Sequence, residues 1–308
     1  MIGDSWLIFQ YFYEVNIIKF PAFLTIRNAN CLIQRCEAAL LSKEKEIVFD
    51  FSTCSFSEPF AITLLVGAML ASINRGHKVT YMRSPNKKLE DYLKRIGFYG
   101  WGKGTKGKLK SSGKHVELRH LNAVDPLYTD TIIQVLQNQL TLSLGVRQSL
   151  HLSLNELMTN AFDHSQTQMG CFVCAQAYKE RGNVNICLTD FGRGILKSLS
   201  SSQKYNYLDN SIEAIELSIE EGVSSRVNRA AGLGLTHIHR FLKVNEGQIH
   251  IISGDGWVYW NYGQGVSKPV IKKKLGVEFE GTIVNIIARA DGEGIYFLES
   301  ENPEEDIF

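Results

Sequence analysis

The first hundred residues alternate between short apolar segments and longer amphipathic ones. Short runs of branched and aromatic residues are typical of strands, and longer runs with a helical period are typical of helices. The strand-like segments are IIKF, EIVFDFS and HKVTYM, and the helix-like segments are the stretch from Pro21 to Leu41, FAITLLVGAMLASINRG and KKLEDYLKRIGF. This alternation predicts a small α/β domain over residues 1–99.

Residues 100–114 interrupt the alternation with a segment rich in lysine and glycine. The segment holds almost nothing that could fill a core, so we interpret it as a linker or an exposed hairpin. Its lysines could contact phosphates, but Trp101 is its one aromatic residue, and a set of stacking side chains is missing. We therefore expect no nucleic-acid partner.

Residues 115–308 place helix-like segments before and between strand-like ones. The strand HVELRHL leads to two predicted helices, over about 125–145 and 146–163, and the strands GCFVCAQAY and NVNICLTD follow. GQIHIIS, WVYW and TIVNIIAR predict further strands, and we interpret residues 255–278 as a β-hairpin excursion. This order predicts an α/β sandwich with its helices on one face of the sheet.

The predicted helix LHLSLNELMTNAFDHS separates two kinds of side chain. At about 100° per residue, its apolar residues fall on one broad face. Glu156, Asn160 and Asp163 fall within roughly 60° of one another on the opposite face. Taken alone, this cluster also fits an ordinary solvated surface.

Three glycine-containing motifs follow this helix. Asp190 ends a predicted strand, and Gly192 and Gly194 after it would let the backbone approach a flat ligand closely. The segment AGLGL precedes a predicted helix, whose N-terminus suits phosphate oxygens. EGT, residues 280–282, opens the last predicted strand. Each of these motifs alone is weak, because glycine-rich turns are common.

Together and in this order, NELMTNAFDHS, DFGRGI, AGLGL and EGT resemble the four nucleotide-binding boxes of the GHKL superfamily, which includes histidine kinases, anti-sigma-factor serine kinases and gyrase. The resemblance covers about residues 115–290 and implies a Bergerat-type α/β sandwich that binds ATP with Mg²⁺. Within it, residues 196–231 correspond to an ATP lid, which in such proteins closes over the nucleotide.

The resemblance also implies a role for each motif residue. Asn160 would supply an oxygen to Mg²⁺, a hard ion that takes few protein ligands. Asp163 and His164 would lie beside it, and His164 either contacts a phosphate or merely packs. Asp190 would accept a hydrogen bond from the exocyclic amine of adenine, with the help of Thr282. The remaining positions would make room for the base and bind the phosphates: Gly192, Gly194, Gly232, Leu233, Gly234 and Leu235.

Glu156 distinguishes two hypotheses for the activity. In hydrolysing and serine-phosphorylating members of the superfamily, the equivalent glutamate acts as a general base, which is worth roughly 10² to 10⁴ in rate. The first hypothesis is an ATPase or a serine/threonine protein kinase of the anti-sigma-factor type. The second is an ATP-gated protein-interaction module with little or no catalysis. Autophosphorylation on histidine is the least favoured, because we find no helical hairpin to carry the histidine.

Residues 45–99 resemble a STAS domain, the fold of anti-sigma-factor antagonists, through the IVFDFS strand, a small-residue helix and an RGHKV return. Pro59 or Phe60 stands where that family often carries a phosphorylatable serine, so we expect no such regulation here. Tethering two domains raises their effective concentration to about the millimolar range. We expect a protein partner, either this STAS-like domain or a separate regulator; a homodimer is left open.

Composition bears on the partners and the compartment of the protein more than on its activity. The 33 Lys and Arg balance 32 Asp and Glu to a formal charge of +1, which gives no whole-protein field for nucleic acid or membranes. No segment is long and apolar enough to span a bilayer. The 6 cysteines, without a secretory signal, indicate reduced thiols in a cytoplasmic protein, and we place Cys171 and Cys174 in a buried strand.

Overall fold

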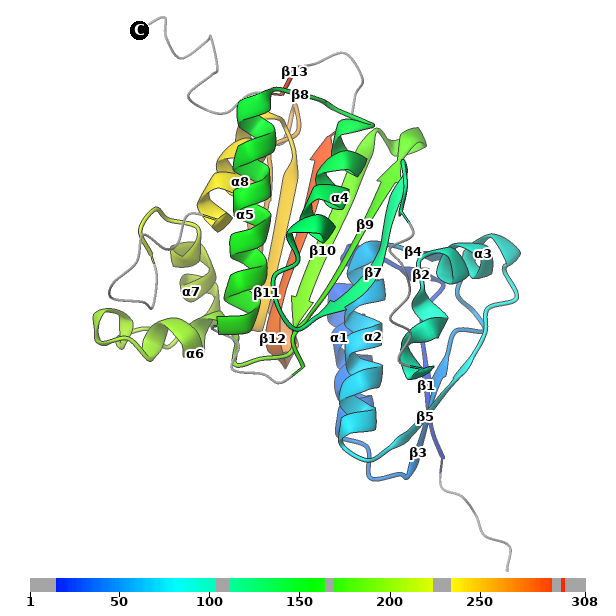
Figure 1. Cartoon of the computed structure of the whole chain (residues 1–308). Coiled ribbons are helices and arrows are strands. Elements are labelled where there is room, and N and C mark those ends of the chain that lie inside the picture. Colours follow the sequence, from blue (N-terminus) through cyan, green and yellow to red (C-terminus); the bar gives the residue numbers. More distant parts are fainter. Residues whose placement is uncertain (1–14, 104–110, 164–168, 224–233, 290–294, 297–308) are drawn as a thin grey trace, which may run out of the picture.

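The fold is given by a computed structural model, a mixed α/β structure with parallel and antiparallel sheets. Figure 1 shows the chain as a cartoon. The residues described are 15–103, 111–163, 169–223, 234–289 and 295–296. Within them, no helix combines the length and the apolar character needed to cross a membrane.

The N-terminal region, residues 15–103, is built around a 3-stranded parallel sheet of order β1-β3-β5. The strands of this sheet are β1 (Val15–Lys19), β3 (Glu46–Asp50) and β5 (Lys78–Met82), and a separate parallel pair is formed by β2 (Phe23–Leu24) and β4 (Phe56–Ser57). The helices of this region are η1 (Ile26–Asn28), α1 (Ala29–Leu40), α2 (Pro59–Asn74), α3 (Lys87–Arg95) and η2 (Phe98–Lys103). The predicted alternation of strands and helices is confirmed.

The C-terminal region is built on a 6-stranded sheet of order β11-β12-β10-β9-β7-β6. Its strands are β6 (Ser111–Ser112), β7 (His115–Leu121), β9 (Cys171–Tyr178), β10 (Asn183–Asp190), β11 (Gln248–Asn261) and β12 (Val270–Arg289), while β8 (Thr141–Leu142) pairs with β13 (Ile295–Tyr296). Its helices are α4 (Pro126–Gln137), α5 (Leu144–Asp163), η3 (Lys179–Arg181), α6 (Gly194–Ser200), η4 (Gln203–Tyr205), α7 (Ser211–Ser218) and α8 (Gly234–Val244).

Most predicted elements of this region are confirmed. The excursion at 255–278 is a hairpin of β11 and β12, as expected. Residues 111–115 belong to the β6-β7 hairpin, which agrees with the hairpin alternative for the end of the segment 100–114. One predicted boundary is wrong. The first helix of the predicted pair ends at Gln137 instead of near 145. The prediction was too long because β8 pairs with a segment more than a hundred residues away, which local periodicity does not reveal.

The two faces of the six-stranded sheet are both covered. Helices α4, α5 and α8 pack on the face that we call the inner face, seen in front of the sheet in Figure 1. Helices α1 and α2 contact β9, β10 and β12 on the opposite, outer face. Our expectation of helices on one face was therefore incomplete. The physical reason is that Phe172, Cys174 and Ile283 make part of the outer face apolar, and the N-terminal helices bury it.

Helix α2 makes the closest contacts between the two regions. The Thr63 Oγ1 lies 2.8 Å from the Thr189 Oγ1, and both residues are fully buried. At Gly67, a Cβ atom would lie 1.9 Å from the ring of Phe191, so only glycine allows this approach. The N-terminal and C-terminal regions thus share one continuous hydrophobic cluster.

Candidate functional site

The side chain of Asp190 lies at the end of β10, buried to 4% exposure. Its Oδ1 accepts a hydrogen bond from the Gly192 N–H at 2.9 Å. Thr282 lies opposite it on β12, and the backbone N–H and hydroxyl of Thr282 also hydrogen-bond the carboxylate. Burial outweighs these hydrogen bonds and raises the pKa of Asp190 to about 7.

Two glycines bring the segments around Asp190 into contact. A Cβ at Gly281, whose φ is 142°, would lie 2.1 Å from the Asp190 carbonyl oxygen. Gly194 has a φ of 78°, and its Cβ would lie 2.7 Å from the Ser253 Oγ. That hydroxyl accepts from the Ile195 N–H and donates to the Gly281 carbonyl, each at 2.8 Å. The DFGRGI and EGT motifs, far apart in sequence, therefore form one compact structure at the end of the sheet.

A second group of predicted residues meets where α8 begins against α5. A Cβ at Gly234 would lie 2.9 Å from the Cβ of Glu156 and 3.1 Å from the Ser153 carbonyl oxygen. Glu156 and Leu235 are half-buried. The first N–H groups of α8 therefore lie beside Glu156, and a helix N-terminus is favourable for anions.

Asn160 lies one helical turn after Glu156, and Asp163 is the last residue of α5. Asn160 is half-buried and Asp163 is exposed. In Figure 1 the C-terminal end of α5, the tip of β10 and the start of α6 lie at the same end of the sheet. The fold thus brings the helix that carries Asn160 to the end of the sheet that carries Asp190. His164, Gly232 and Leu233, together with residues 224–231 of the proposed lid, lie outside the described residues.

The potential metal ligands are few. In the part of the chain that the structure describes, no group of three or more His, Cys, Asp or Glu side chains is arranged to hold a metal ion. Mg²⁺ does not need such a group, because it keeps several waters and binds substrate phosphates through few protein oxygens. A half-buried amide such as that of Asn160 fits this requirement. Cys171 and Cys174 lie buried in β9 as predicted, and burial raises the pKa of both thiols.

Sequence reasoning missed the residues that connect this site to the N-terminal region. Phe191, directly after Asp190, packs edge-on against Phe172 and Phe279 and against Gly67 of α2. Thr189, directly before it, contacts Thr63 of the same helix. The sequence of β10 did contain a signal. Its polar residues Asn183, Asn185 and Thr189 all fall on one face of the strand, which indicates that this face is more polar than the other.

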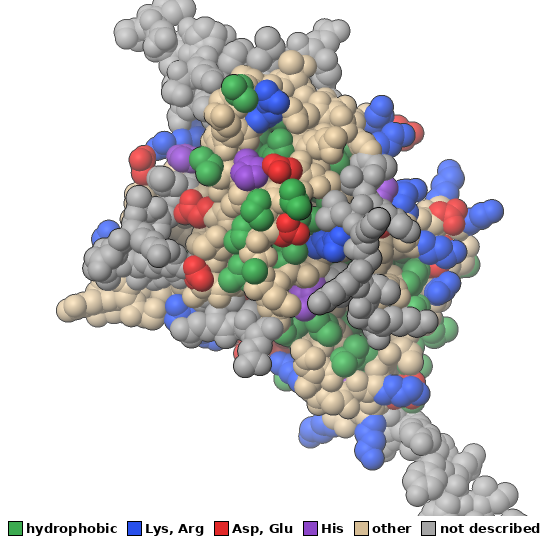
Figure 2. Space-filling model, viewed as in Figure 1, with side chains coloured by type: hydrophobic (Ala, Val, Ile, Leu, Met, Phe, Trp, Pro, Cys, Tyr) green, Lys and Arg blue, Asp and Glu red, His purple; other side chains and the backbone are tan. Residues whose placement is uncertain are grey.

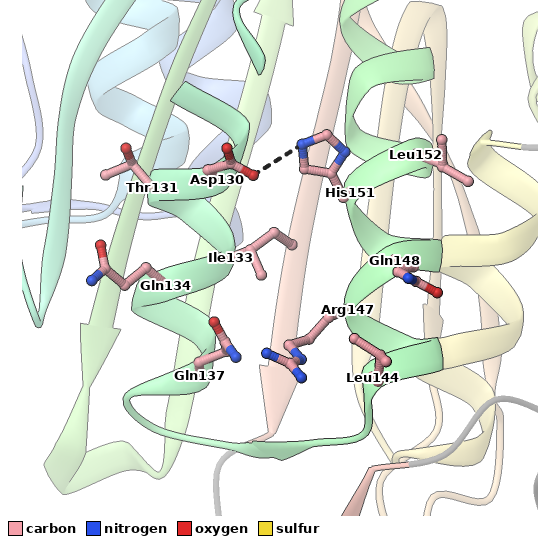
Figure 3. A pocket seen from close by; sticks show the side chains of 10 residues that line it. All are labelled: Asp130, Thr131, Ile133, Gln134, Gln137, Leu144, Arg147, Gln148, His151 and Leu152. Atoms are coloured by element: carbon pink, nitrogen blue, oxygen red, sulfur yellow. Dashed lines mark ion pairs between the residues drawn. The ribbon is translucent and has the colours of Figure 1, made fainter. Parts of the chain in front are cut away.

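A groove between α4 and α5 is a separate feature of the surface. It is a hollow of about 780 Å³ lined by residues of both helices. Figure 2 shows hydrophobic and acidic side chains over this face, and Figure 3 shows the ion pair between His151 Nε2 and Asp130 Oδ1 at 3.1 Å. The groove contains none of the predicted site residues, so it is not part of the candidate site.

Comparisons with models of known protein families and with curated proteins found no match to this chain. The geometry of the site and the resemblance of its motifs therefore carry the proposal made below.

Proposed function

We propose that this protein binds ATP with Mg²⁺ in a GHKL-like pocket and acts as a regulatory protein. The observation that carries the proposal is the buried Asp190 carboxylate, framed by Thr282 and by two glycines that no other residue could replace without a clash. Burying a carboxyl group costs free energy, because desolvation disfavours its charged form. Perturbed carboxyls of this kind are frequent at functional sites.

In this proposal Asp190 recognises the adenine base. Its carboxylate accepts from the exocyclic amine, and Thr282 holds the carboxylate in position. The ionised carboxylate is a stronger acceptor than the protonated acid, so with a pKa of about 7 we expect adenine recognition to strengthen as the pH rises through neutrality. The N–H groups at the start of α8 are positioned for the phosphates, and Asn160 would hold Mg²⁺.

Bound ATP would supply a phosphoryl group, and Glu156 is the residue of this chain that could use it. The glutamate lies beside the N-terminus of α8, where the phosphates would be held. A carboxylate there can accept the proton of an attacking water or of a protein hydroxyl. This arrangement supports an ATPase or a serine/threonine kinase of the anti-sigma-factor type.

The second candidate is an ATP-gated interaction module, and the contact with α2 favours it. Thr189 and Phe191 flank Asp190 in sequence, and both contact α2 of the N-terminal region. A ligand that moves the Asp190 loop must therefore displace or reorient the packing of α2. Nucleotide binding would in this way change the surface of the STAS-like region, whether or not ATP is hydrolysed.

Calorimetric titration with Mg²⁺-ATP tests the binding proposal. We expect Asp190→Ala to weaken binding by about a hundredfold, because one charge-assisted hydrogen bond and its positioning are lost. Asp130→Ala, which removes an exposed carboxylate from the α4–α5 groove, should bind like the wild type. Equal affinity of Asp190→Ala and the wild type would disprove adenine recognition by Asp190.

Incubation with γ-labelled ATP then separates the two candidates. Free phosphate or labelled protein that disappears in Glu156→Ala, while ATP binding survives, would establish an enzyme with Glu156 as base. Tight binding with neither product in the wild type would favour the interaction module.

A further inference from the structure

The outer face of the six-stranded sheet changes from apolar to polar along its strands. Under α1 and α2 it presents Phe172, Thr189 and Ile283, which belong to one row of paired residues across the sheet. The next row contains Asn285 and His250, and the row after it contains Gln176, Asn185 and Gln248. These polar side chains are largely buried. Apolar residues would suffice to pack the sheet against helices, so the buried polar residues call for an explanation.

Beside this polar area lies a cavity of about 730 Å³ between the two regions of the chain. One wall is the outer face of β10, β11 and β12, and the other is formed by η1 and the short strands β2 and β4. Its volume falls within the range of roughly 300 to 1,000 Å³ that is typical of small-molecule sites. It is much larger than a site for a single buried water.

Several buried polar atoms of the cavity lining have no hydrogen-bond partner among the described residues. They are the Oδ1 of Asn183, the Oδ1 of Asn185 and the Nε2 of His250. Asn185 is 3% exposed and His250 is 6% exposed. Each unsatisfied buried polar atom lowers the stability of the fold by about 1–3 kcal/mol. Three such atoms at one cavity indicate that a ligand or ordered water supplies their hydrogen bonds.

His250 acts as a hydrogen-bond donor toward the cavity. Burial, with a smaller contribution from Lys273, lowers its pKa to about 3, so the imidazole is neutral. The Trp257 Nε1–H donates to its Nδ1 at 3.4 Å, which assigns the proton to Nε2. The cavity therefore offers a donor at His250 and acceptors at Asn183 and Asn185.

The remaining lining adds aromatic surface and positive charge. The ring of Tyr259 stacks on His250 with centroids 4.7 Å apart, and the Lys273 Nζ lies 4.4 Å from the Trp257 ring centroid. Arg181 is paired with Glu58 at 2.9 Å. Arg27 and Lys273 form no ion pair with any residue that the structure describes, so the rim carries two uncompensated positive charges.

We propose that this cavity is a second ligand site, separate from the Asp190 site, for a planar hydrogen-bonding heterocycle that carries an anionic group, of the nucleoside monophosphate class. The donor and acceptors at its base match the edge of a nucleobase, since amide side chains pair well with base edges. The cations at its rim match the phosphate. Because its walls come from both regions, an occupant would stabilise their contact.

Titration calorimetry on the full chain tests this site with AMP, GMP, CMP and UMP as probes, each in the presence of saturating Mg²⁺-ATP. We expect at least one monophosphate to bind with a Kd below about 1 mM. Asn185→Leu should weaken that binding by about tenfold or more, because an acceptor is lost. The fold should tolerate this change, since it removes an unsatisfied buried atom.

Lys272 and Lys273 allow a second test that does not depend on the buried substitution Asn185→Leu. Lys273→Ala should weaken binding about fivefold through the lost charge. Lys272→Ala should have no effect, because Lys272 lies on the other side of the strand and pairs with Glu216 at 2.6 Å. Asp190→Asn should leave monophosphate binding intact, whatever it does to ATP.

Three results would overturn the proposal: no monophosphate binds below about 1 mM, binding survives in both Asn185→Leu and Lys273→Ala, or binding is lost in Asp190→Asn. The last result would show that monophosphate binding depends on the Asp190 site and that the cavity is not a separate site. If ATP does not bind, the proposed function is wrong, but the proposal of a monophosphate site is still tested by the monophosphate titrations.

Discussion

The two faces of the six-stranded sheet are built on different principles. The inner face packs under α4, α5 and α8 through apolar side chains such as Ile186, Ile249 and Val284. The outer face is apolar where α1 and α2 cover it and carries Asn185, His250 and Asn285 farther along its strands. A shared backbone thus supports a closed core on one side and a partly polar contact between two regions on the other.

Under the two ligand sites proposed above, the outer face has a role besides stability. An inner face of matched apolar residues maximises burial and close packing. The outer face instead gives up some of that stability, because several of its buried amide and imidazole atoms are unsatisfied. We interpret this as the cost of a contact that responds to ligands at the Asp190 site and in the cavity.

The largest effect is expected where α2 meets the Asp190 loop. Gly67→Leu forces a side chain into the ring of Phe191, and we expect the free energy of unfolding to fall by more than about 3 kcal/mol. Ile73→Ala, at an exposed position of the same helix, should change it by less than about 0.5 kcal/mol. Urea unfolding measures both. Equal stability of the two variants would mean that the outer-face contact contributes little.

The second prediction concerns the pH dependence of stability. Because the pKa of Asp190 is raised from 3.8 to about 7 in the folded protein, its contribution is fully present below about pH 4 and is lost as the pH rises through 7. Each unit of pKa difference is worth about 1.4 kcal/mol. Asp190→Asn should remove this loss, so that its stability relative to the wild type increases from about pH 5 to about pH 8.

The wild type must be compared with Asp190→Asn because two histidines change the pH dependence of stability in the opposite direction. Burial lowers the pKa of His239 to about 4 and that of His250 to about 3, so their contribution to stability is lost as the pH falls below about 6.5. Both contributions are common to the wild type and the variant. A difference between the two proteins that stays constant with pH would refute a perturbed Asp190.

A smaller effect is expected from the hydrogen bond between the regions. Thr63→Val removes one of two fully buried hydroxyls that lie 2.8 Å apart, and we expect a loss of about 1–2 kcal/mol. Replacing both Thr63 and Thr189 by valine should cost less than the sum of the single changes, because neither hydroxyl is then left without the other. Strict additivity in this double-mutant cycle would argue against the contact.

The smallest effect should have the opposite sign. Asn285 is 1% exposed, and neither amide atom has a partner among the described residues. Asn285→Leu should therefore leave stability unchanged or raise it by up to about 1 kcal/mol. Ile286→Val, the adjacent inner-face residue, should lower it by about 1 kcal/mol, which contrasts the two faces directly.

Local elements were largely predictable from the pattern of apolar positions. The strands β1, β3 and β5, the helices α2 and α3, the strands β9 and β10 and the β11–β12 hairpin appear where periodicity and turn residues predict them. The predicted helix over 21–41 is shorter: it begins at Ala29, after the short strand β2 and the helix η1. The prediction failed at the end of α4, where a distant segment pairs with β8. It failed there because strand pairing across a long loop depends on contacts that no local window contains.

For the candidate site, the order of residue types predicts the chemistry of the motifs: an acid followed by glycines at a strand end, and Glu156 and Asn160 on one helix face. Which motifs come into contact follows from the folded chain, since Gly281 contacts Asp190 through the β10–β12 pairing and Gly234 contacts Glu156 through the packing of α8 on α5. The tertiary structure alone also decided that α2 covers the outer face, leaving the cavity beside it. Side-chain periodicity reports which face of an element is apolar, but the partner that buries that face is chosen by packing of the whole chain.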